Sequence, residues 1–367
     1  MSGRLAPGTP ALPDDGVHWS YDKKEHPMRG VIMVAPGDVR VEERDKPTII
    51  EPTDAIISVS AACICGSDLW PYRGAEPVDR TAMGHEYVGV VEEIGSDVST
   101  IRVGDFVVGS FFASDNTCEI CQAGYQTHCI NRQPGAPTGA QSQFARIPLA
   151  DGTLVATPGH PDPELIPSLL AASDVLGTGW FAAVAAEAGP GKTVAVVGDG
   201  AVGLLAILAA KQLGAERIIA MSRHADRQAL AREFGATDIV EERGDEGIAR
   251  IKELTGGLGA HSVIEAVGTQ ESLRQAMRST RAGGHVGYVG VFHDVALEGR
   301  ELFLSGVHLH GGPAPVRRFL PELIRLIWER EIDPGRVFDL TLPLDEAAEG
   351  YRAMDERRAI KVLLTTA

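Results

Sequence analysis

The sequence predicts an α/β protein of two domains, in which an irregular β domain precedes a doubly wound parallel sheet. Three observations lead to this prediction. The chain has 367 residues, more than a single core of ordinary size contains. Short β-branched runs fill residues 28–174, whereas strands alternate with helices over residues 175–312. A glycine-rich turn joins the first strand of the second part to its first helix.

The strands and helices are expected at runs bounded by Gly, Pro or Asp. In the first part the predicted strands are Gly30–Val34, Ala55–Ser60, Tyr87–Ile94 and Phe106–Gly109. In the second part we expect strands at Thr193–Val197, Arg217–Met221, Ser262–Val267, His285–Val289 and Gly306–Leu309, with helices at Ala201–Leu213 and Ala225–Phe234. Beyond Gly312 we expect a helix at Val316–Arg330 and a strand-like tail at Lys361–Leu364.

Composition and charge limit the classes of partner. The sum of 34 basic and 50 acidic residues gives a net charge of −16, which disfavours nucleic-acid or anionic-membrane partners because both need a basic surface. No apolar run reaches the ~18 residues that cross a bilayer, and the N-terminus lacks a signal-peptide pattern. Residues 1–27 predict a flexible extension, or an overlong start with Met28 as the working beginning. We expect a cytoplasmic location.

The segment Val194–Gly203 carries three glycines in the order G-x-G-x-x-G, directly after an apolar strand and at the start of a helix. The first glycine allows a tight turn, the second lets backbone approach a pyrophosphate, and the third lets helix and strand pack closely. A glycine-rich turn without a ligand is the alternative. The predicted cofactor-binding residues of this Rossmann-type loop are Gly198, Gly200, Ala201, Val202 and Gly203.

The end of the next strand predicts which nicotinamide cofactor binds. An NAD site usually has an acid there, to accept hydrogen bonds from the ribose hydroxyls. Here the position is Ser222, followed by Arg223 and, one turn later, Arg227. Because Arg offers a planar fork of donors to phosphate oxygens, this pattern favours the 2′-phosphate of NADP over NAD. The alternative is that both arginines are solvated charges at a helix start.

Two groups of residues have the chemistry of metal ligands. Cys65-Gly-Ser-Asp68 is followed by Gly84-His-Glu-Tyr-Val-Gly-Val-Val-Glu-Glu-Ile-Gly95, and a thiolate with an imidazole suits zinc. Further on, three of the five cysteines lie close together, at Cys118, Cys121 and Cys129. In a chain expected in the cytoplasm, such spacing indicates metal before disulfides.

Together these strings resemble the zinc-dependent alcohol dehydrogenases of the medium-chain dehydrogenase/reductase family. The resemblance continues through Val103-Gly-Asp105, the cysteine cluster, the glycine loop and the tail, and covers nearly everything from Met28 onward. It implies that residues 28–174 form a GroES-like irregular β-barrel catalytic domain and that residues 175–312 form a Rossmann domain. It further implies that residues 313–367 return to the catalytic domain, and that the protein is a homodimer or homotetramer.

The resemblance also implies a set of site residues. Cys65 and His85 match the first two ligands of a catalytic zinc. The third, a Cys, Asp or Glu, precedes the cofactor domain in a segment ending Thr-Gly, which here places Asp174; a helix N-cap is the alternative role for that residue. Glu86 matches the carboxylate that supports or transiently replaces a ligand. Cys63 falls outside the pattern, and we expect a small buried hydrophobe.

The implied chemistry is hydride transfer. Zinc is a Lewis acid that lowers the pKa of a bound oxygen, toward ~7 in the case of water, so a bound alcohol can release hydride to a nicotinamide ring, and the reverse reaction reduces a carbonyl. Ser67 matches the hydroxyl that passes the alcohol proton onward, with a turn residue as its alternative role. Thr178 is expected to contact the cofactor.

The chain departs from the family at the proton path. Many relatives have a histidine five residues beyond the first cysteine, where this chain has Trp70. The proton must then leave through cofactor hydroxyls, water or another group such as Asp68. Trp70 and Tyr72 are expected either in the substrate pocket or in the core. Candidate pocket walls are Trp70, Phe111, Phe112 and His293.

A second departure concerns the structural zinc. The family pattern has four cysteines, and here the first of them is Asp115, followed by Cys118, Cys121 and Cys129. Aspartate oxygen ligates zinc at a distance similar to that of nitrogen ligands, so we expect a Cys3Asp site. The alternatives are an empty lobe with free thiols, or His128 as a substitute ligand.

The sequence thus predicts a zinc-dependent oxidoreductase acting on an alcohol, or on its aldehyde or ketone, with NADP(H). An NAD-linked polyol or sugar dehydrogenase of the same family is the nearest alternative. A zinc-free quinone-reductase-like member is disfavoured because it would lack the set Cys65, His85 and Glu86. A relative that binds a cofactor without catalysis is disfavoured by the intact ligands.

Overall fold

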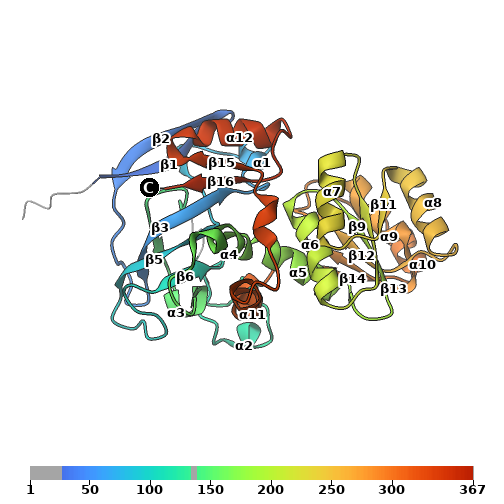
Figure 1. Cartoon of the computed structure of the whole chain (residues 1–367), viewed down its shortest axis with the longest axis horizontal. Helices are drawn as coiled ribbons and strands as arrows, with labels where there is room; N and C mark the ends of the chain where they lie inside the picture. Colours follow the sequence, from blue (N-terminus) through green and yellow to red (C-terminus); the bar gives the residue numbers. More distant parts are fainter. Residues whose placement is uncertain (1–26, 134–138, 367) are drawn as a thin grey trace, which may run out of the picture.

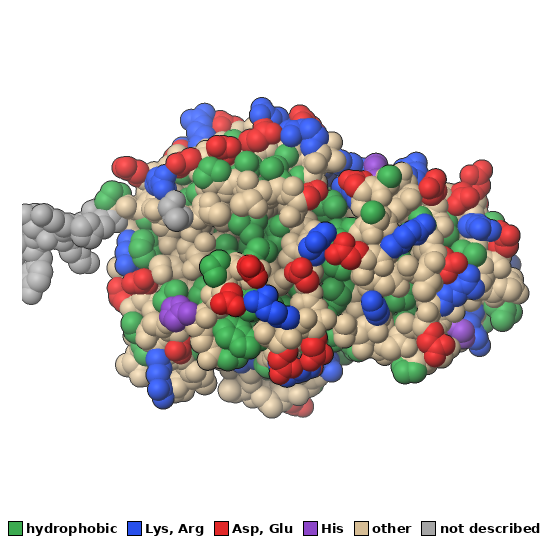
Figure 2. All heavy atoms as spheres, in the orientation of Figure 1, with side chains coloured by type: hydrophobic (Ala, Val, Ile, Leu, Met, Phe, Trp, Pro, Cys, Tyr) green, Lys and Arg blue, Asp and Glu red, His purple; other side chains and the backbone are tan. Residues whose placement is uncertain are grey.

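The computed structural model describes residues 27–133 and 139–366, which form two lobes with helix α5 (Val175–Ala185) between them (Figure 1). The predicted extension 1–27 lies outside the described residues except for Pro27, which begins strand β1. Acidic and basic side chains are interspersed over the face drawn in Figure 2. Among the described residues, no single helix is both long and apolar enough to cross a membrane; only the bent pair 163–172 and 175–185 meets that test together.

The first lobe is built on two β-sheets. One has the strand order β15-β16-β3-β5-β6-β8, with β7 paired to β3, and the other has the order β2-β1-β4. The strands are β1 (Pro27–Ala35), β2 (Asp38–Asp45), β3 (Ala55–Ile64), β4 (Thr81–Ala82), β5 (Tyr87–Ile94), β6 (Phe106–Gly109), β7 (Phe144–Ile147), β8 (Leu154–Ala156), β15 (Leu340–Pro343) and β16 (Val362–Thr365). Because β16 runs antiparallel to β3, the last residues of the chain complete a sheet begun far upstream.

Short helices connect and cover these strands. They are α1 (Leu69–Tyr72), α2 (Glu119–Gln122), α3 (Ala150–Thr153), α4 (Ile166–Ala172), α11 (Val316–Trp328) and α12 (Ala347–Asp355). The apolar side of α11 faces α4 and α5, where Leu320, Leu323 and Ile327 are fully buried. Helices α4 and α11 therefore belong to one apolar core that continues through α5 and α6 into the second lobe.

The second lobe is a parallel sheet with the strand order β11-β10-β9-β12-β13-β14. The strands are β9 (Thr193–Val197), β10 (Arg217–Met221), β11 (Asp238–Val240), β12 (Ala260–Glu265), β13 (Thr280–Tyr288) and β14 (His308–Gly311), and the helices are α6 (Ala201–Gln212), α7 (Ala225–Phe234), α8 (Gly244–Leu254), α9 (Gln270–Ser279) and α10 (Gly299–Ser305). Helices lie on both faces of the sheet (Figure 1). This arrangement confirms the predicted doubly wound fold, whose ligands bind where the strand order reverses, here between β9 and β12.

One predicted strand is misplaced. Residues 306–309 were expected to be extended, but Gly306 ends α10 with a φ of 62°, and β14 begins only at His308. Since glycine adopts this left-handed conformation at little cost, the residue stops the helix before the strand starts. As an edge strand, β14 pairs only with β13 among the described strands, so its pattern of buried residues is weak.

Candidate active site

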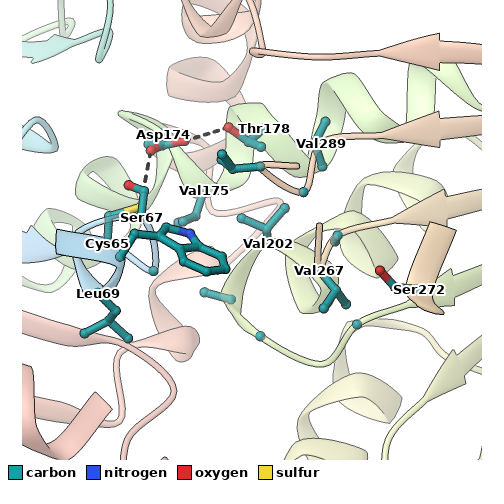
Figure 3. A pocket seen from close by; sticks show the side chains of 18 of the residues that line it. Cys65, Ser67, Leu69, Asp174, Val175, Thr178, Val202, Val267, Ser272 and Val289 are labelled. Atoms are coloured by element: carbon teal, nitrogen blue, oxygen red, sulfur yellow. Dashed lines mark hydrogen bonds between the residues drawn. The ribbon is translucent and has the colours of Figure 1, made fainter. Parts of the chain in front are cut away.

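A cavity of about 1490 Å³ lies between the two lobes. The first lobe supplies the turn after β3, helix α1 and the loop after β6, and the second supplies the glycine loop and the ends of β12 and β13. Figure 3 shows Cys65, Ser67 and Asp174 at one end of this cavity, with Val202 and Val267 farther along it. The cavity therefore connects the predicted metal ligands to the predicted cofactor loop.

The four predicted ligands of the catalytic zinc converge. Cys65 follows β3, His85 and Glu86 precede β5, and Asp174 precedes α5. One ligand atom from each residue lies within 4.8 Å of all the others. The Asp174 Oδ2 atom is 3.4 Å from His85 Nε2 and 3.8 Å from Cys65 Sγ. The structure thus brings together a thiol, an imidazole and two carboxylates, a donor set that suits zinc.

Asp174 stands at the N-cap position of α5, but its side chain makes no capping hydrogen bond. The carboxylate instead accepts a hydrogen bond of 2.6 Å from Thr178 Oγ1 and points toward Cys65 (Figure 3). The capping role therefore does not explain this residue. Thr178 was expected to contact the cofactor; it lines the cavity and also orients the carboxylate.

Electrostatics at this cluster favour a cation. Burial alone would lower the pKa of His85, but hydrogen bonds to Asp174 and Cys65 outweigh it and hold that pKa well above its ordinary value. Burial alone would raise the pKa of Asp174, yet the neighbouring His85 holds it below its ordinary value. Both shifts have the same cause, which is that the acceptors around His85 stabilise positive charge. A divalent cation fits the same donors.

A buried ion pair backs this cluster. Lys361 Nζ lies 2.8 Å from Glu86 Oε1, and the two side chains are 1% and 0% exposed. The second carboxylate oxygen, Glu86 Oε2, is buried with no hydrogen-bond partner among the described residues, which leaves a lone pair for a cation. Lys361 was predicted only as the first residue of the strand-like tail. The sequence hint is a lysine directly before the apolar strand β16. That Glu86 is its partner becomes evident only once β16 pairs with β3.

Asp68 is not on the cavity wall. It is buried, and its carboxylate accepts hydrogen bonds from the Cys65 amide at 3.0 Å and from Gln141 Nε2 at 3.1 Å. Its Oδ1 atom lies 3.6 Å from His85 Nδ1, the ring nitrogen that faces away from Asp174. The structure therefore gives no support to a proton exit through Asp68, whose carboxylate faces the imidazole at a distance longer than a hydrogen bond.

The expected pocket walls divide into two groups. Trp70, Phe111 and Phe112 line the cavity. Tyr72 packs against the buried Tyr351 with ring centroids 5.6 Å apart, so it belongs to the core. His293 is not a wall residue either. Its ring contacts Trp70 with the centroids 3.8 Å apart and the ring planes tilted by 35°, so it packs against a wall residue without lining the cavity.

Ser67, the predicted proton-passing residue, lines the cavity between Cys65 and Trp70. Its hydroxyl makes no hydrogen bond to any described residue, so the alternative role of a turn residue bonded to local backbone finds no partner here. A hydroxyl that is half-buried, beside the ligand cluster and without a protein partner is available to a substrate.

Within the glycine loop, one glycine is required by the packing of the protein and another lies next to open space. A Cβ atom on Gly203 would lie 2.1 Å from the carbonyl oxygen of Gly198, so this glycine is required by the packing of α6 against β9. Gly198 itself has a φ of 122°, which side chains rarely adopt. A Cβ atom on Gly200 would meet nothing within 4 Å. The protein alone does not require glycine there, as expected where a cofactor occupies the space.

The residues expected at the adenosine end also come together. Ser222 is buried and donates a 2.7 Å hydrogen bond to Asp199, the second residue of the glycine loop. Arg227 donates to the Asp199 carbonyl at 3.1 Å and lies 3.5 Å from its carboxylate, with a side chain only 12% exposed. Arg223 is exposed but lines the cavity. Arg227 is therefore not a solvated helix-start charge. Asp199 was overlooked because its role depends on the fold bringing two loops together.

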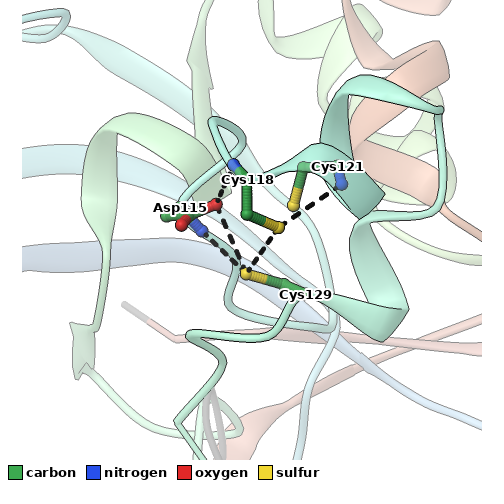
Figure 4. A group of neighbouring side chains, drawn as sticks. All are labelled: Asp115, Cys118, Cys121 and Cys129. Atoms are coloured by element: carbon green, nitrogen blue, oxygen red, sulfur yellow. Dashed lines mark hydrogen bonds between the residues drawn. The ribbon is translucent and has the colours of Figure 1, made fainter.

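The cysteine lobe forms a second compact cluster (Figure 4). One ligand atom each from Asp115, Cys118, Cys121 and Cys129 lies within 4.8 Å of all the others. Backbone amides of Cys121 and Asp115 donate to the sulfurs of Cys118 and Cys129, both at 3.5 Å, and the first of these lowers the pKa of Cys118. His128 is not in the cluster; its ring contacts Thr127 instead.

Comparison with known proteins places this architecture in a family. Residues 51–158 match the alcohol dehydrogenase GroES-like domain, and residues 201–329 match the zinc-binding dehydrogenase domain. A protein of Mycobacterium tuberculosis named a probable zinc-binding alcohol dehydrogenase is 38% identical over 332 residues, which cover 88% of this chain and 84% of that protein. Zinc-type alcohol dehydrogenase B of Aspergillus flavus is 34% identical, covering 92% and 81% of the two chains.

Solved structures of similar proteins have the same fold. The alcohol dehydrogenase from Thermus sp. ATN1 is 32% identical with a TM-score of 0.84, covering 93% of this chain and all of that one. A protein from Sinorhizobium meliloti 1021 whose structure holds NADP is 26% identical with a TM-score of 0.77, covering 92% and 99%. This chain belongs to the zinc-dependent alcohol dehydrogenases of the medium-chain dehydrogenase/reductase family.

Proposed function

We propose that this oxidoreductase transfers a hydride between an alcohol, or its aldehyde or ketone, and NADP(H). The observation that carries the proposal is the convergence of the cluster around Cys65, His85 and Asp174 with the glycine loop on one cavity. The substrate alcohol loses a hydride from carbon to the nicotinamide ring and a proton from oxygen. Trp70, Phe111 and Phe112 restrict water and leave an apolar space for the carbon chain.

Cys65, His85 and Asp174 would hold the catalytic zinc, with Glu86 behind them. When bound, zinc supplies a Lewis acid that polarises the substrate oxygen. The hydroxyl of Ser67 receives the proton of the alcohol and passes it to cofactor hydroxyls or water, since the position of the usual relay histidine holds Trp70. The Thr178 hydroxyl keeps the carboxylate of Asp174 turned toward the ion.

NADP(H) is proposed over NAD(H) because the strand end that usually carries an acid has Ser222, and Arg223 and Arg227 lie beside it. The Sinorhizobium relative, solved with NADP, is consistent with this choice. One observation favours NAD(H) as the second candidate: the Asp199 carboxylate lies 2.7 Å from the Ser222 hydroxyl, where it could accept bonds from ribose hydroxyls. The carboxylate is already engaged by Ser222 and Arg227, which is why NADP(H) is preferred.

A structural zinc is proposed at Asp115, Cys118, Cys121 and Cys129. Three thiols and one carboxylate oxygen make a four-donor set of the kind that closes a structural site. Hydrogen bonds from backbone amides stabilise thiolates, and two of the three sulfur atoms accept such a bond. The Asp115 carboxylate also accepts amide bonds from Thr117 and Cys118, which hold its pKa below the ordinary value against the opposing effect of burial.

We propose that the protein is a homo-oligomer that assembles through β14 and α10. Strand β14 is the edge of the parallel sheet, and the adjoining helix exposes Phe303 at 84% and Leu304 at 67%. A two-fold pairing of these edges would cover both the open backbone and the apolar side chains. Light scattering after size-exclusion chromatography measures the mass, and the Phe303→Asp variant is expected to shift it toward the monomer.

The activity is tested by following NADPH and NADH oxidation with a panel of aldehydes and ketones, together with metal analysis. Cys65→Ser is expected to lose the catalytic zinc and at least about 100-fold in rate, because a ligand of the Lewis acid is removed. Cys63→Ala is the matched control, since this neighbouring buried thiol lies outside the ligand cluster. Zinc-free protein with full activity would refute the proposal, and a large preference for NADH would refute its choice of cofactor.

A further inference from the structure

The adenosine end of the cavity holds more positive charge than Ser222 and its two neighbours predict. Arg243 reaches the same place from the loop between β11 and α8, with its Nη2 atom 3.7 Å from Asp199 Oδ2. Its side chain is 27% exposed and lines the cavity. Arg227, in the first turn of α7, and Arg243, in the loop before α8, therefore approach one carboxylate from two different elements.

A fourth arginine comes from the other lobe. Arg357 follows α12, lines the same cavity, and has a φ of 59°. It forms no ion pair with any residue that the structure describes, and the same holds for Arg223. Burial lowers the pKa of Arg243, and the positive charges of Arg223 and Arg357 lower it further. Arg223, Arg243 and Arg357 therefore line one cavity, and the first and last are near enough for their charge to act on Arg243.

Charge counting indicates the ligand. The cavity wall here carries four arginines against two carboxylates, Asp199 and Glu271, so 4 − 2 leaves two uncompensated positive charges. A phosphate monoester carries about −1.5 to −2 at neutral pH. Arg also matches the geometry of phosphate oxygens through paired N–H groups. The surplus matches the charge of one phosphate monoester, and the 2′-phosphate is the group of that kind that NADP carries and NAD lacks.

Resting on the proposed NADP(H) specificity, we propose that Arg243 and Arg357 complete, with Arg223 and Arg227, a binding site for the 2′-phosphate that spans both lobes. Asp199 holds Arg227 and Arg243 in place before the cofactor binds. Because Arg357 belongs to the first lobe and the other three to the second, the phosphate draws the two lobes together. NADP(H) would thereby close the cavity more firmly than NAD(H).

Two fragments of the cofactor test this site without requiring catalysis. Isothermal titration compares adenosine 2′,5′-bisphosphate with 5′-AMP, which differ only in the 2′-phosphate. Arg243→Ala and Arg357→Ala are each expected to weaken binding of the bisphosphate about 10- to 30-fold, the effect of losing a charge-assisted hydrogen bond at a partly exposed site. Binding of 5′-AMP should change less than about 3-fold.

Neighbouring arginines provide matched controls. Arg250 pairs with Glu253 on α8, and Arg358 pairs with Glu349 and Glu356 next to Arg357. Their alanine variants are expected to bind both fragments as the wild type does. The KM for NADPH should rise in Arg243→Ala and Arg357→Ala while the KM for NADH stays within about 3-fold, which also shows that the variants fold.

The outcomes separate the two proposals. If the wild type binds both fragments equally, the NADP(H) assignment fails. If the wild type prefers the bisphosphate but Arg243→Ala and Arg357→Ala keep that preference, the assignment stands and the two-lobe site is wrong. An equal loss for both fragments would place these arginines on the 5′-phosphate and would likewise overturn the site.

Discussion

Replacing Lys361 by Met tests how the base of the ligand cluster is held together. Methionine keeps most of the length of the side chain but removes its charge, leaving the fully buried carboxylate of Glu86 without the cation 2.8 Å away. Removing one member of a buried pair costs about 3–5 kcal/mol. For a cooperative unit of roughly 150–250 residues, each kcal/mol shifts the melting temperature by about 2–4 °C. Lys361→Met should therefore lower it by roughly 6–20 °C.

The assay is thermal unfolding followed by circular dichroism on chelator-treated protein, so that no metal ion substitutes for the lost lysine. Burial would lower the pKa of Lys361, but the carboxylate of Glu86 holds it well above its ordinary value. A raised lysine pKa contributes stability at every pH below the unfolded value of about 10.4. The deficit of the variant should therefore be the same at pH 6 and pH 9.

Two comparisons isolate the pair. Lys192→Met removes the lysine of a pair with Glu187 whose side chains are 33% and 55% exposed, and it should cost no more than about 1 kcal/mol. The double variant Lys361→Met/Glu86→Gln should recover most of the loss, because the stranded charge is gone. If Lys361→Met melts like Lys192→Met, or if the double variant melts as low as the single one, the reasoning about this buried pair is refuted.

Three further predictions concern other parts of the molecule. Gly203→Ala should destabilise the folded protein, because the added Cβ atom would lie 2.1 Å from the carbonyl oxygen of Gly198. Gly200→Ala should keep the melting temperature and weaken cofactor binding. An equal drop in melting temperature for the two variants would contradict this prediction. Asp151, whose pKa is held below 3.8 by hydrogen bonds from residues 99 and 100 despite burial, contributes stability that is lost as pH falls through its folded pKa. Asp151→Asn should therefore melt lower than the wild type at pH 7, and this difference in melting temperature should shrink as the pH falls below about 3.9; a difference that stays constant with pH would contradict the prediction. Metal analysis should find two zinc ions per chain and one in Cys129→Ser with activity largely kept, and one ion in both proteins would leave the cysteine lobe empty.

The regular elements of the second lobe could be predicted because their signals are local. The strands Thr193–Val197 and Arg217–Met221 and the helix Ala225–Phe234 have the predicted bounds. Apolar runs buried on both faces of a sheet, each followed by Gly or a helix start, mark these boundaries. The edge strand β14 was shifted, because an edge strand has no second neighbour to impose a buried pattern.

At the site, the spacing of Cys65 and His85 within long motifs indicated which residues converge, and the structure brings them together with Asp174. What could not be predicted depends on distant segments. Lys361 meets Glu86 only because β16 pairs with β3, and Arg357 lines the same cavity as Arg243 although it comes from the opposite lobe. Residue type alone suggested roles for Asp68 and His293 that the fold does not support, since neither side chain lines the cavity.

The central claim is that zinc at Cys65, His85 and Asp174 drives hydride transfer. It is tested most directly by titrating zinc into chelator-treated protein while recording NADPH-dependent carbonyl reduction and bound metal in the same samples. We expect no activity in the zinc-free protein, and we expect activity to recover in proportion to the filling of one zinc site that the Cys65→Ser variant lacks. Undiminished activity in protein without zinc, or recovery that persists in Cys65→Ser, would contradict it.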